Sequence, residues 1–78
     1  MKVEILTPEK SVFDGEARLV SLPGSDGSLG ILNNHAPLIT TLAAGTVKVE
    51  DVDGKVQEFA VKGGTVEVLN NRVIVLAE

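Results

Sequence analysis

Cysteine, tryptophan and tyrosine are missing from this sequence of 78 residues, which also has a single histidine and two phenylalanines. Without cysteine, neither a disulfide nor a thiolate metal site can supplement the thin core that a domain of this length buries. Stability must therefore come from packing or from a partner. The lack of cysteine is also typical of proteins in a reducing compartment.

A basic surface and long apolar runs are missing as well. Seven Lys and Arg residues stand against eleven Asp and Glu residues, which gives a net charge of −4. Proteins that bind nucleic acids need a basic face or a row of stacking aromatic side chains, so this class is excluded. No apolar run approaches the length of about 20 residues that crosses a bilayer, and the sequence shows no signal-peptide pattern. We therefore expect a soluble, cytosolic, acidic domain that neither binds nucleic acid nor inserts into a membrane.

β-Branched residues are abundant, with twelve Val, four Ile and five Thr in the sequence. These residues favour strands over helices. Nowhere do apolar residues repeat with helical spacing over ten positions, so we expect no helix. About nine to ten short strands in one domain over residues 1–78 must bury their apolar faces against one another. The predicted fold is therefore all-β, an antiparallel β-sandwich or flattened barrel.

The second half of the sequence predicts an antiparallel meander, because alternating segments are separated by two-residue turn sequences. The segments are Thr46–Val52, Lys55–Lys62, Thr65–Leu69 and Arg72–Leu76, and the turns are Asp53-Gly54, Gly63-Gly64 and Asn70-Asn71. Arg72–Leu76 is apolar on both faces and predicts a central strand. Val56 is out of phase with Phe59 and Val61, so we expect a bulge at Val56.

The first half predicts shorter and less regular strands, separated by proline, glycine and asparagine. The strands are Lys2–Leu6, a segment that begins at Val12, Glu16–Leu22, Leu29–Leu32 and Leu38–Leu42, and the loop between the last two is Asn33–Pro37. Pro8 follows the first strand and ends it, because proline has no N–H to donate to a ladder. Gly15 is expected to bend or bulge the second strand.

Convergent catalytic groups are scarce. His35 is the single imidazole, so a serine hydrolase site would have to combine it with Ser25 or Ser28 and with Asp26. No strand–turn–helix pattern presents either serine as a nucleophile, so we interpret His35 as a loop or interface residue. One histidine and no cysteine cannot complete a zinc site, and the glycines after Pro23 lack the spacing of a phosphate-binding loop. We expect no catalysis, no metal and no cofactor.

Lys55 supplies an alternative function. Lipoyl and biotinyl carrier domains are acidic all-β modules of about this length, and they modify a lysine at an exposed hairpin tip. Lys55 follows the Asp53-Gly54 turn rather than lying at its centre, and the two halves of the sequence show no quasi-repeat. A carrier domain modified at Lys55 stays as the alternative, and an ordinary solvated lysine is the simpler interpretation.

The segment Ser21–Gly45 mixes turn formers with apolar side chains. Glycine, proline and the pair Asn33-Asn34 are interleaved there with leucine and isoleucine. Segments of this composition are costly to expose unless they fold against something. Their apolar residues therefore either close one end of the sandwich or form a docking surface for a partner.

Motifs along the whole chain carry a resemblance to a known family. They are Val3-Glu4-Ile5-Leu6-Thr7-Pro8, Phe13-Asp14-Gly15, Gly24-Ser25-Asp26-Gly27-Ser28-Leu29-Gly30-Ile31, His35-Ala36-Pro37-Leu38, Gly63-Gly64-Thr65-Val66-Glu67-Val68 and Asn71-Arg72-Val73-Ile74-Val75-Leu76-Ala77. Each motif is weak alone, but together they stand in the family's order and spacing. The sequence resembles the N-terminal β-sandwich domain of the epsilon subunit of F-type ATP synthases, the subunit called delta in mitochondria.

The resemblance implies a non-catalytic central-stalk (rotor) subunit of a proton-translocating ATP synthase, which couples proton flow to ATP synthesis from ADP and phosphate. It implies a contact with the polar loops of the c-ring, made by Asp26, Gly27, Ser28, Leu29 and Gly30. It also implies a contact with the gamma subunit, made by His35, Pro37, Leu38 and Thr40. The implied location is peripheral, on the cytoplasmic side of the bacterial inner membrane.

Two departures from the family pattern matter. Many members carry an acid at the position of Ser28, so an ion pair with the ring from this position is not expected here. The C-terminal helical hairpin that usually follows the β-sandwich, and that inhibits ATP hydrolysis or binds ATP in various members, is not among these 78 residues. The sequence is therefore either one of the naturally short forms or an excised domain. We expect coupling from this β-sandwich and infer nothing about inhibition of ATP hydrolysis.

Overall fold

Nine short strands form the regular structure of the chain in the computed structural model, which describes residues 1–78. They are β1 (Lys2–Leu6), β2 (Ser11–Glu16), β3 (Leu19–Gly24), β4 (Gly27–Leu32), β5 (Leu38–Leu42), β6 (Gly45–Glu50), β7 (Val56–Val61), β8 (Gly64–Leu69) and β9 (Arg72–Ala77). The structure has no helix, as the sequence predicted, and so none that could span a membrane.

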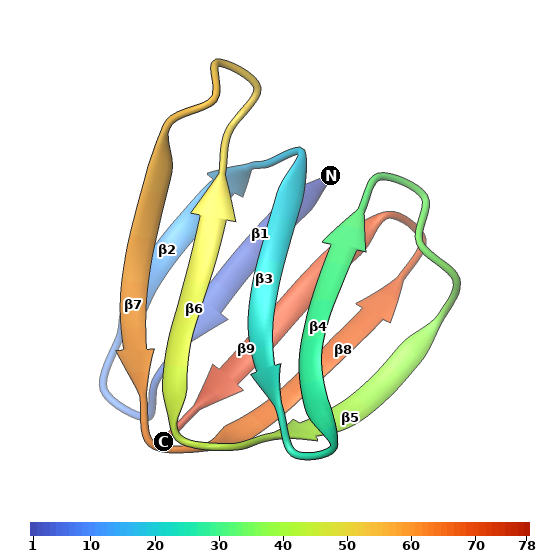
Figure 1. The fold of residues 1–78 in the computed structure, drawn as a ribbon. Helices are drawn as coiled ribbons and strands as arrows, with labels where there is room; N and C mark the ends of the chain where they lie inside the picture. The colour runs from blue at the N-terminus through green and yellow to red at the C-terminus, as the bar shows by residue number, and fades with distance from the viewer.

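The strands are arranged in two packed layers (Figure 1). Their hydrogen-bonded order is β2-β1-β9-β8-β5-β3-β6-β7, with β4 paired to the other side of β3. The sheet folds over where β5 meets β3 through one residue pair, Gly24 with Leu42. The back layer therefore contains β2, β1, β9, β8 and β5, and the front layer contains β4, β3, β6 and β7. This architecture confirms the predicted all-β sandwich.

The core lies between the two layers and is apolar throughout. Alternation directs every second side chain of a strand inward, so that Val66 and Val68 of β8 pack opposite the front layer, whose β6 contributes Val47 and Val49. Sixteen buried residues form one hydrophobic cluster, and no polar or charged side chain is buried. Hydrophobic contact therefore holds the two layers together, and backbone ladders join the strands within each layer.

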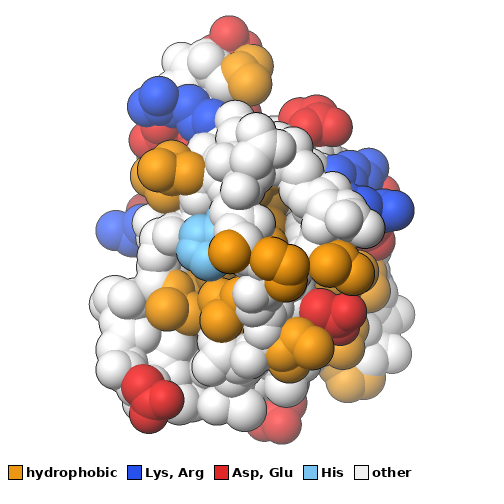
Figure 2. All heavy atoms as spheres, turned by 90° about the vertical axis from the view of Figure 1, so that its right-hand side faces the viewer, with side chains coloured by type: hydrophobic (Ala, Val, Ile, Leu, Met, Phe, Trp, Pro, Cys, Tyr) orange, Lys and Arg blue, Asp and Glu red, His pale blue; other side chains and the backbone are white.

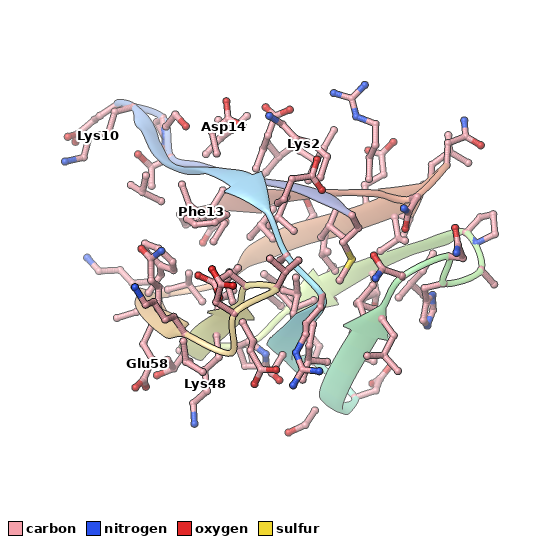
Figure 3. The ribbon with its side chains drawn as sticks, turned by 90° about the horizontal axis from the view of Figure 1, so that it is seen from above. Lys2, Lys10, Phe13, Asp14, Lys48 and Glu58 are labelled. Carbon is pink, nitrogen blue, oxygen red and sulfur yellow. The ribbon has the colours of Figure 1, made fainter.

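Phe13 of β2 and Phe59 of β7 close one edge of the sandwich. Their ring centroids lie 5.7 Å apart at an interplanar angle of 61°, which is an edge-to-face contact. Figure 3 shows Phe13 directed between the layers, with Lys2 and Asp14 outside the back layer. The Asp14 carboxylate accepts a hydrogen bond from the Lys2 ammonium group, and this contact raises the pKa of Lys2. The two aromatic residues of the chain are thus both used in packing.

β9 is a central strand, as predicted. It runs parallel to β1, with Val73 opposite Val3, and antiparallel to β8, with Val75 opposite Val66. Asn70 and Asn71 form the β8–β9 turn with φ angles of 51° and 60°, in the left-handed region that asparagine tolerates. The last strand therefore joins the first strand to the rest of the back layer.

The predicted meander is wrong at one step. β6 pairs with β7 and β8 pairs with β9, but β7 and β8 lie in different layers (Figure 1). The chain crosses between the layers at Gly63 and Gly64, whose φ angles of 147° and 133° are open to glycine and strained for other residues. A pair of glycines can follow a strand both in a hairpin turn and in a crossover to the other layer. The sequence pattern therefore could not distinguish a hairpin from a crossover at this point.

Both predicted bulges are wrong as well. The β6–β7 register runs without a break, so Val56 simply points outward and is 50% exposed. A register shift lies instead between β1 and β2, next to Val12, while Gly15 pairs in register with Val3. An outward-facing valine is tolerated on the edge strand β7, and this is why the phase of Val56 did not require a bulge.

The predicted strand Glu16–Leu22 is two strands joined by a corner. β2 ends and β3 begins within it, and the two strands lie in different layers. Ala17 is buried at the corner, whereas Arg18 is exposed and its guanidinium pairs with the Glu50 carboxylate. The alternation breaks at the adjacent apolar residues Leu19 and Val20, and the buried side chains change phase there from Ala17 to Val20 and Leu22. The sequence prediction ran one strand through this break.

Gly64→Ala should destabilise the fold, because an added Cβ would overlap the carbonyl oxygen of Leu76 and the φ angle is strained for any other residue. We expect the free energy of unfolding to fall by about 3 kcal/mol, measured by urea denaturation followed by circular dichroism. Gly30→Ala is the matched control, since its Cβ would meet only Leu19, at 3.9 Å. It should change stability by less than about 0.5 kcal/mol, and equal losses in both variants would contradict this interpretation of Gly64.

Candidate functional site

The β3–β4 hairpin presents the first candidate surface at one end of the sandwich (Figure 1). Gly24 pairs with Gly27 across the turn Ser25-Asp26, and Gly27 has a φ angle of 130°, which favours glycine. The turn is tied to β5, because Thr41 Oγ1 donates to Ser25 Oγ at 2.8 Å and the Ser25 N–H donates to the Thr41 carbonyl at 3.0 Å. The hairpin is thereby fixed relative to the back layer.

Most residues predicted for a c-ring contact are open to solvent on this hairpin. Asp26 and Gly27 lie at the tip, and Ser28 and Gly30 face outward on β4. Leu29 differs, because the alternation of β4 directs its side chain inward, where it is half-buried and packs against the core. Leu29 therefore supports the hairpin and contributes little to its exposed surface.

A shallow polar depression of about 240 Å³ lies beside the hairpin on the outer side of the front layer. Its lining residues are Ser21, Leu22, Pro23, Ser28, Thr46 and Lys48. Lys48 points away from the front layer (Figure 3) and belongs to none of the ion pairs of the structure. Three hydroxyl groups and an ammonium group suit hydrogen bonds to the backbone or to a carboxylate in a loop of another chain.

The loop Asn33–Pro37 lies at the opposite end of β4 and is anchored by its asparagines. Asn33 Oδ1 accepts a hydrogen bond from the amino group of Met1 at 2.7 Å. The Asn34 N–H donates to Asn71 Oδ1 at 2.7 Å, and Asn34 adopts a φ angle of 62°. These contacts connect the loop to the back layer and hold the residues that follow.

His35 is exposed on this loop, and its Nδ1 lies 2.7 Å from the carbonyl oxygen of Ala36. The serine and aspartate residues that a hydrolase would need, Ser25, Ser28 and Asp26, lie in or next to the turn at the other end of β4 (Figure 1). That strand is six residues long, or roughly 20 Å. The structure therefore excludes this catalytic combination, and no group of three or more His, Cys, Asp or Glu side chains is placed to hold a metal ion.

The residues predicted for a gamma contact do not share one surface. His35 and Pro37 are exposed on the loop, whereas Leu38 and Thr40 are half-buried on the inner side of β5. Leu38 packs against the core. Ile39 lies between them with its side chain 75% exposed. Leu38 and Leu42 both face inward on β5, so Ile39 is the apolar residue of this strand that faces solvent. Ile39 was not among the residues predicted for the gamma contact.

Ile39 belongs to a wider apolar surface on the outer side of the back layer, which we call the outer apolar face. It consists of Pro37, Ile39, Leu69, Ile74 and Leu76. Figure 2 shows hydrophobic side chains gathered around the histidine on this side of the molecule. Contiguous apolar surface of this kind makes the outer apolar face a candidate interaction surface.

Two shallow depressions run along the outer apolar face. The first, of about 360 Å³, is lined by Pro37, Leu38, Ile39, Glu67, Val68 and Leu69. The second, of about 270 Å³, is lined by Glu67, Leu69, Asn70, Arg72 and Ile74. They share Glu67 and Leu69, so they adjoin each other across β5, β8 and β9.

Lys55 lies at the base of the β6–β7 loop. Asp51 Oδ1 accepts hydrogen bonds from the N–H groups of Asp53 and Lys55 at 2.9 and 3.0 Å, and the Asp51 N–H donates to the Lys55 carbonyl at 2.9 Å. The turn itself precedes Lys55. The backbone of Lys55 is therefore bonded to Asp51 at the point where the loop closes, whereas a carrier lysine lies at the centre of a turn.

Sequence comparison matches the whole chain to one family. A family model described as the β-sandwich domain of the ATP synthase delta/epsilon chain matches residues 1–78. The ATP synthase epsilon chain of Desulforamulus reducens is 51% identical over 77 residues, which are 99% of this chain and 58% of that protein. The epsilon chain of Sulfurimonas denitrificans is 45% identical over 78 residues, which are 100% of this chain and 60% of that protein. The chain thus spans somewhat more than half the length of these curated relatives.

Solved structures share the fold. A chain in the cryo-EM structure of the Tetrahymena thermophila mitochondrial ATP synthase central stalk and c-ring matches with a TM-score of 0.79 and 26% identity, covering 99% of this chain and 62% of that one. A chain of the Euglena gracilis mitochondrial ATP synthase matches with a TM-score of 0.90 and 21% identity, covering 96% and 48%, and this likeness concerns the fold alone. None of these proteins is a lipoyl or biotinyl carrier, so the alternative at Lys55 is not supported.

Leu38 and Ile39 should differ sharply in their contribution to stability, because one side chain packs against the core and the other points into solvent. We expect Leu38→Ala to lower the free energy of unfolding by about 2 kcal/mol and Ile39→Ala to change it by less than about 0.5 kcal/mol. Urea denaturation of the two variants measures both values. A larger loss for Ile39→Ala than for Leu38→Ala would show that the phase assigned to β5 is wrong.

Proposed function

The chain belongs to the family of ATP synthase delta/epsilon β-sandwich domains, and from this premise we propose that it is a non-catalytic part of the rotor stalk of a proton-translocating ATP synthase. In this role it links gamma to the c-ring and helps to couple proton flow to ATP synthesis. It binds gamma through the outer apolar face and the polar loops of the ring through the β3–β4 hairpin. The complex, rather than this chain, carries the catalytic sites.

The outer apolar face is the observation that carries the proposed gamma contact. Ile39 is 75% exposed and Leu69 is 49% exposed on neighbouring strands, next to the exposed Pro37. Burying large apolar side chains contributes about 25 cal/mol per Å² of apolar surface. A specific interface needs about 1,000 Å² or more, which this face and the His35 loop can supply together.

The hairpin surface supports the proposed ring contact by its different chemistry. Asp26, Gly27, Ser28 and Gly30 are small or polar and exposed, and the hydroxyl-lined depression adjoins them. A surface of this kind forms hydrogen bonds to polar loops and adds little hydrophobic attraction. The gamma and ring contacts are thus assigned to different surfaces, the outer side of the back layer and the β3–β4 hairpin of the front layer, and can be made at the same time.

The sandwich between the two surfaces suits the transmission of rotation. Its core is one close-packed apolar cluster, and cores packed in this way have low compressibility and transmit strain. A force applied at one surface is therefore transmitted to the other through a stiff core. In this proposal the chain lies at the membrane that houses the ring, on the cytoplasmic side in a bacterium, as a peripheral protein.

Ile39→Asp tests the gamma contact. The substitution places a charge in an apolar interface while leaving the core untouched, so we expect at least about tenfold weaker binding to purified gamma by calorimetry. Val56→Asp is the matched control, because Val56 is also exposed on a strand, at 50%, but on the front layer. Equal binding by both variants would rule out the outer apolar face as the gamma site.

Ser28→Trp tests the ring contact. A bulky side chain on the outer side of β4 should prevent the polar loops of the ring from approaching. We therefore expect the complex of gamma with Ser28→Trp to retain at least about tenfold less purified c-ring in a pull-down than the wild-type complex does. Glu58→Trp is the control, since Glu58 also points outward from the front layer, on β7, three strands away (Figure 3). Undiminished ring retention by Ser28→Trp argues against a contact at the hairpin.

A further inference from the structure

Glu67 is an exposed acid at the centre of the outer apolar face. It faces outward from β8, directly between Ile39 of β5 and Ile74 of β9 in the strand register. It lines both depressions of this face, as does its neighbour Leu69. Figure 2 shows an acidic side chain among the hydrophobic ones on this side of the molecule.

The carboxylate of Glu67 has no partner within the chain. The four ion pairs of the structure join other groups, and no side-chain hydrogen bond involves Glu67. Arg72 lies diagonally across the ladder but directs its guanidinium to Glu4, at 3.5 Å. The charge of Glu67 is therefore satisfied by water alone while the face is open.

A partner that covered this face with apolar side chains alone would bury the carboxylate without compensation. Removing an unpaired charge from water is strongly unfavourable and opposes the gain from burying Ile39 and Leu69 around it. A cation placed opposite the carboxylate reverses this balance, since the attraction of an ion pair enclosed by apolar contacts is stronger than in water. The face thus selects for a basic group inside an apolar surround.

We propose that Glu67 is the charged anchor of the outer apolar face and receives a Lys or Arg side chain that is flanked by apolar side chains of the partner chain. This inference rests on the proposed function, because the partner is taken to be gamma. An Arg fits best, since its guanidinium can bind the carboxylate with two hydrogen bonds and is more weakly hydrated than an ammonium group. The apolar residues then supply most of the affinity and Glu67 supplies the register and the choice of partner.

Glu67→Gln tests the anchor, because it keeps the size of the side chain and removes its charge. We expect binding to purified gamma to weaken about 30-fold by calorimetry, and Glu67→Lys to weaken it further by placing two cations together. Glu58→Gln is the matched control, since Glu58 is an exposed acid on a strand of the opposite layer, and it should bind like the wild type. The urea midpoint of Glu67→Gln should equal that of the wild type.

Salt gives a second readout that a merely structural role of Glu67 would not move. Binding of the wild-type protein should weaken as sodium chloride is raised from 50 to 500 mM, and Glu67→Gln should lose part of this dependence. If the wild type binds gamma but Glu67→Gln binds equally well, the anchor is refuted while the proposed function stands. If the wild type does not bind gamma at micromolar concentrations, the proposed function itself fails. Concentration-dependent dimers of the wild type that Glu67→Lys abolishes would instead assign the face to a second copy and overturn the proposal.

Discussion

The contact between the inner faces of the two layers is the interaction on which the rest of the structure depends. No disulfide assists it, and its sixteen buried residues are all apolar. Each strand must therefore direct its more hydrophobic set of alternate residues inward, because a slip of one residue would turn that set to solvent. This requirement fixes the phase of every strand and, with it, the residues that are left for the surface.

The two candidate surfaces follow from that phase. On β5 the inward position of Leu38 leaves Ile39 outside, and on β4 the inward position of Leu29 leaves Ser28 outside. One surface is consequently apolar with an acid at its centre, and the other is polar and built on a tight hairpin. The two surfaces therefore differ in chemistry, and in the proposed function each meets a different partner on one rigid body.

Much of this could be predicted from the sequence, whereas features that depend on contacts between distant segments could not. Strand content, the central position of Arg72–Leu76 and the Asn70-Asn71 turn follow from local patterns, which the structure bears out. The crossover at Gly63-Gly64 could not be distinguished from a hairpin, because the choice of layer depends on contacts far away in the sequence. The contact roles given to Leu38 and Thr40 came from a family resemblance to the whole segment and stay predictions, and the alternation within β5 directs both side chains inward, where they are half-buried. Glu67 drew no attention because an acid between valines is ordinary until its apolar neighbours on β5 and β9 are known.

A methyl NMR titration tests the central claim most directly. Protein labelled at the methyl groups of isoleucine, leucine and valine would be titrated with unlabelled gamma, so that each surface reports separately. The account predicts that the signals of Ile39, Leu69 and Ile74 shift or broaden at stoichiometric gamma, while those of Val52 and Val56 at the far edge of the front layer do not change. Perturbation of Val52 and Val56, with Ile39 and Leu69 unaffected, would contradict the assignment of the outer apolar face as the surface that gamma covers.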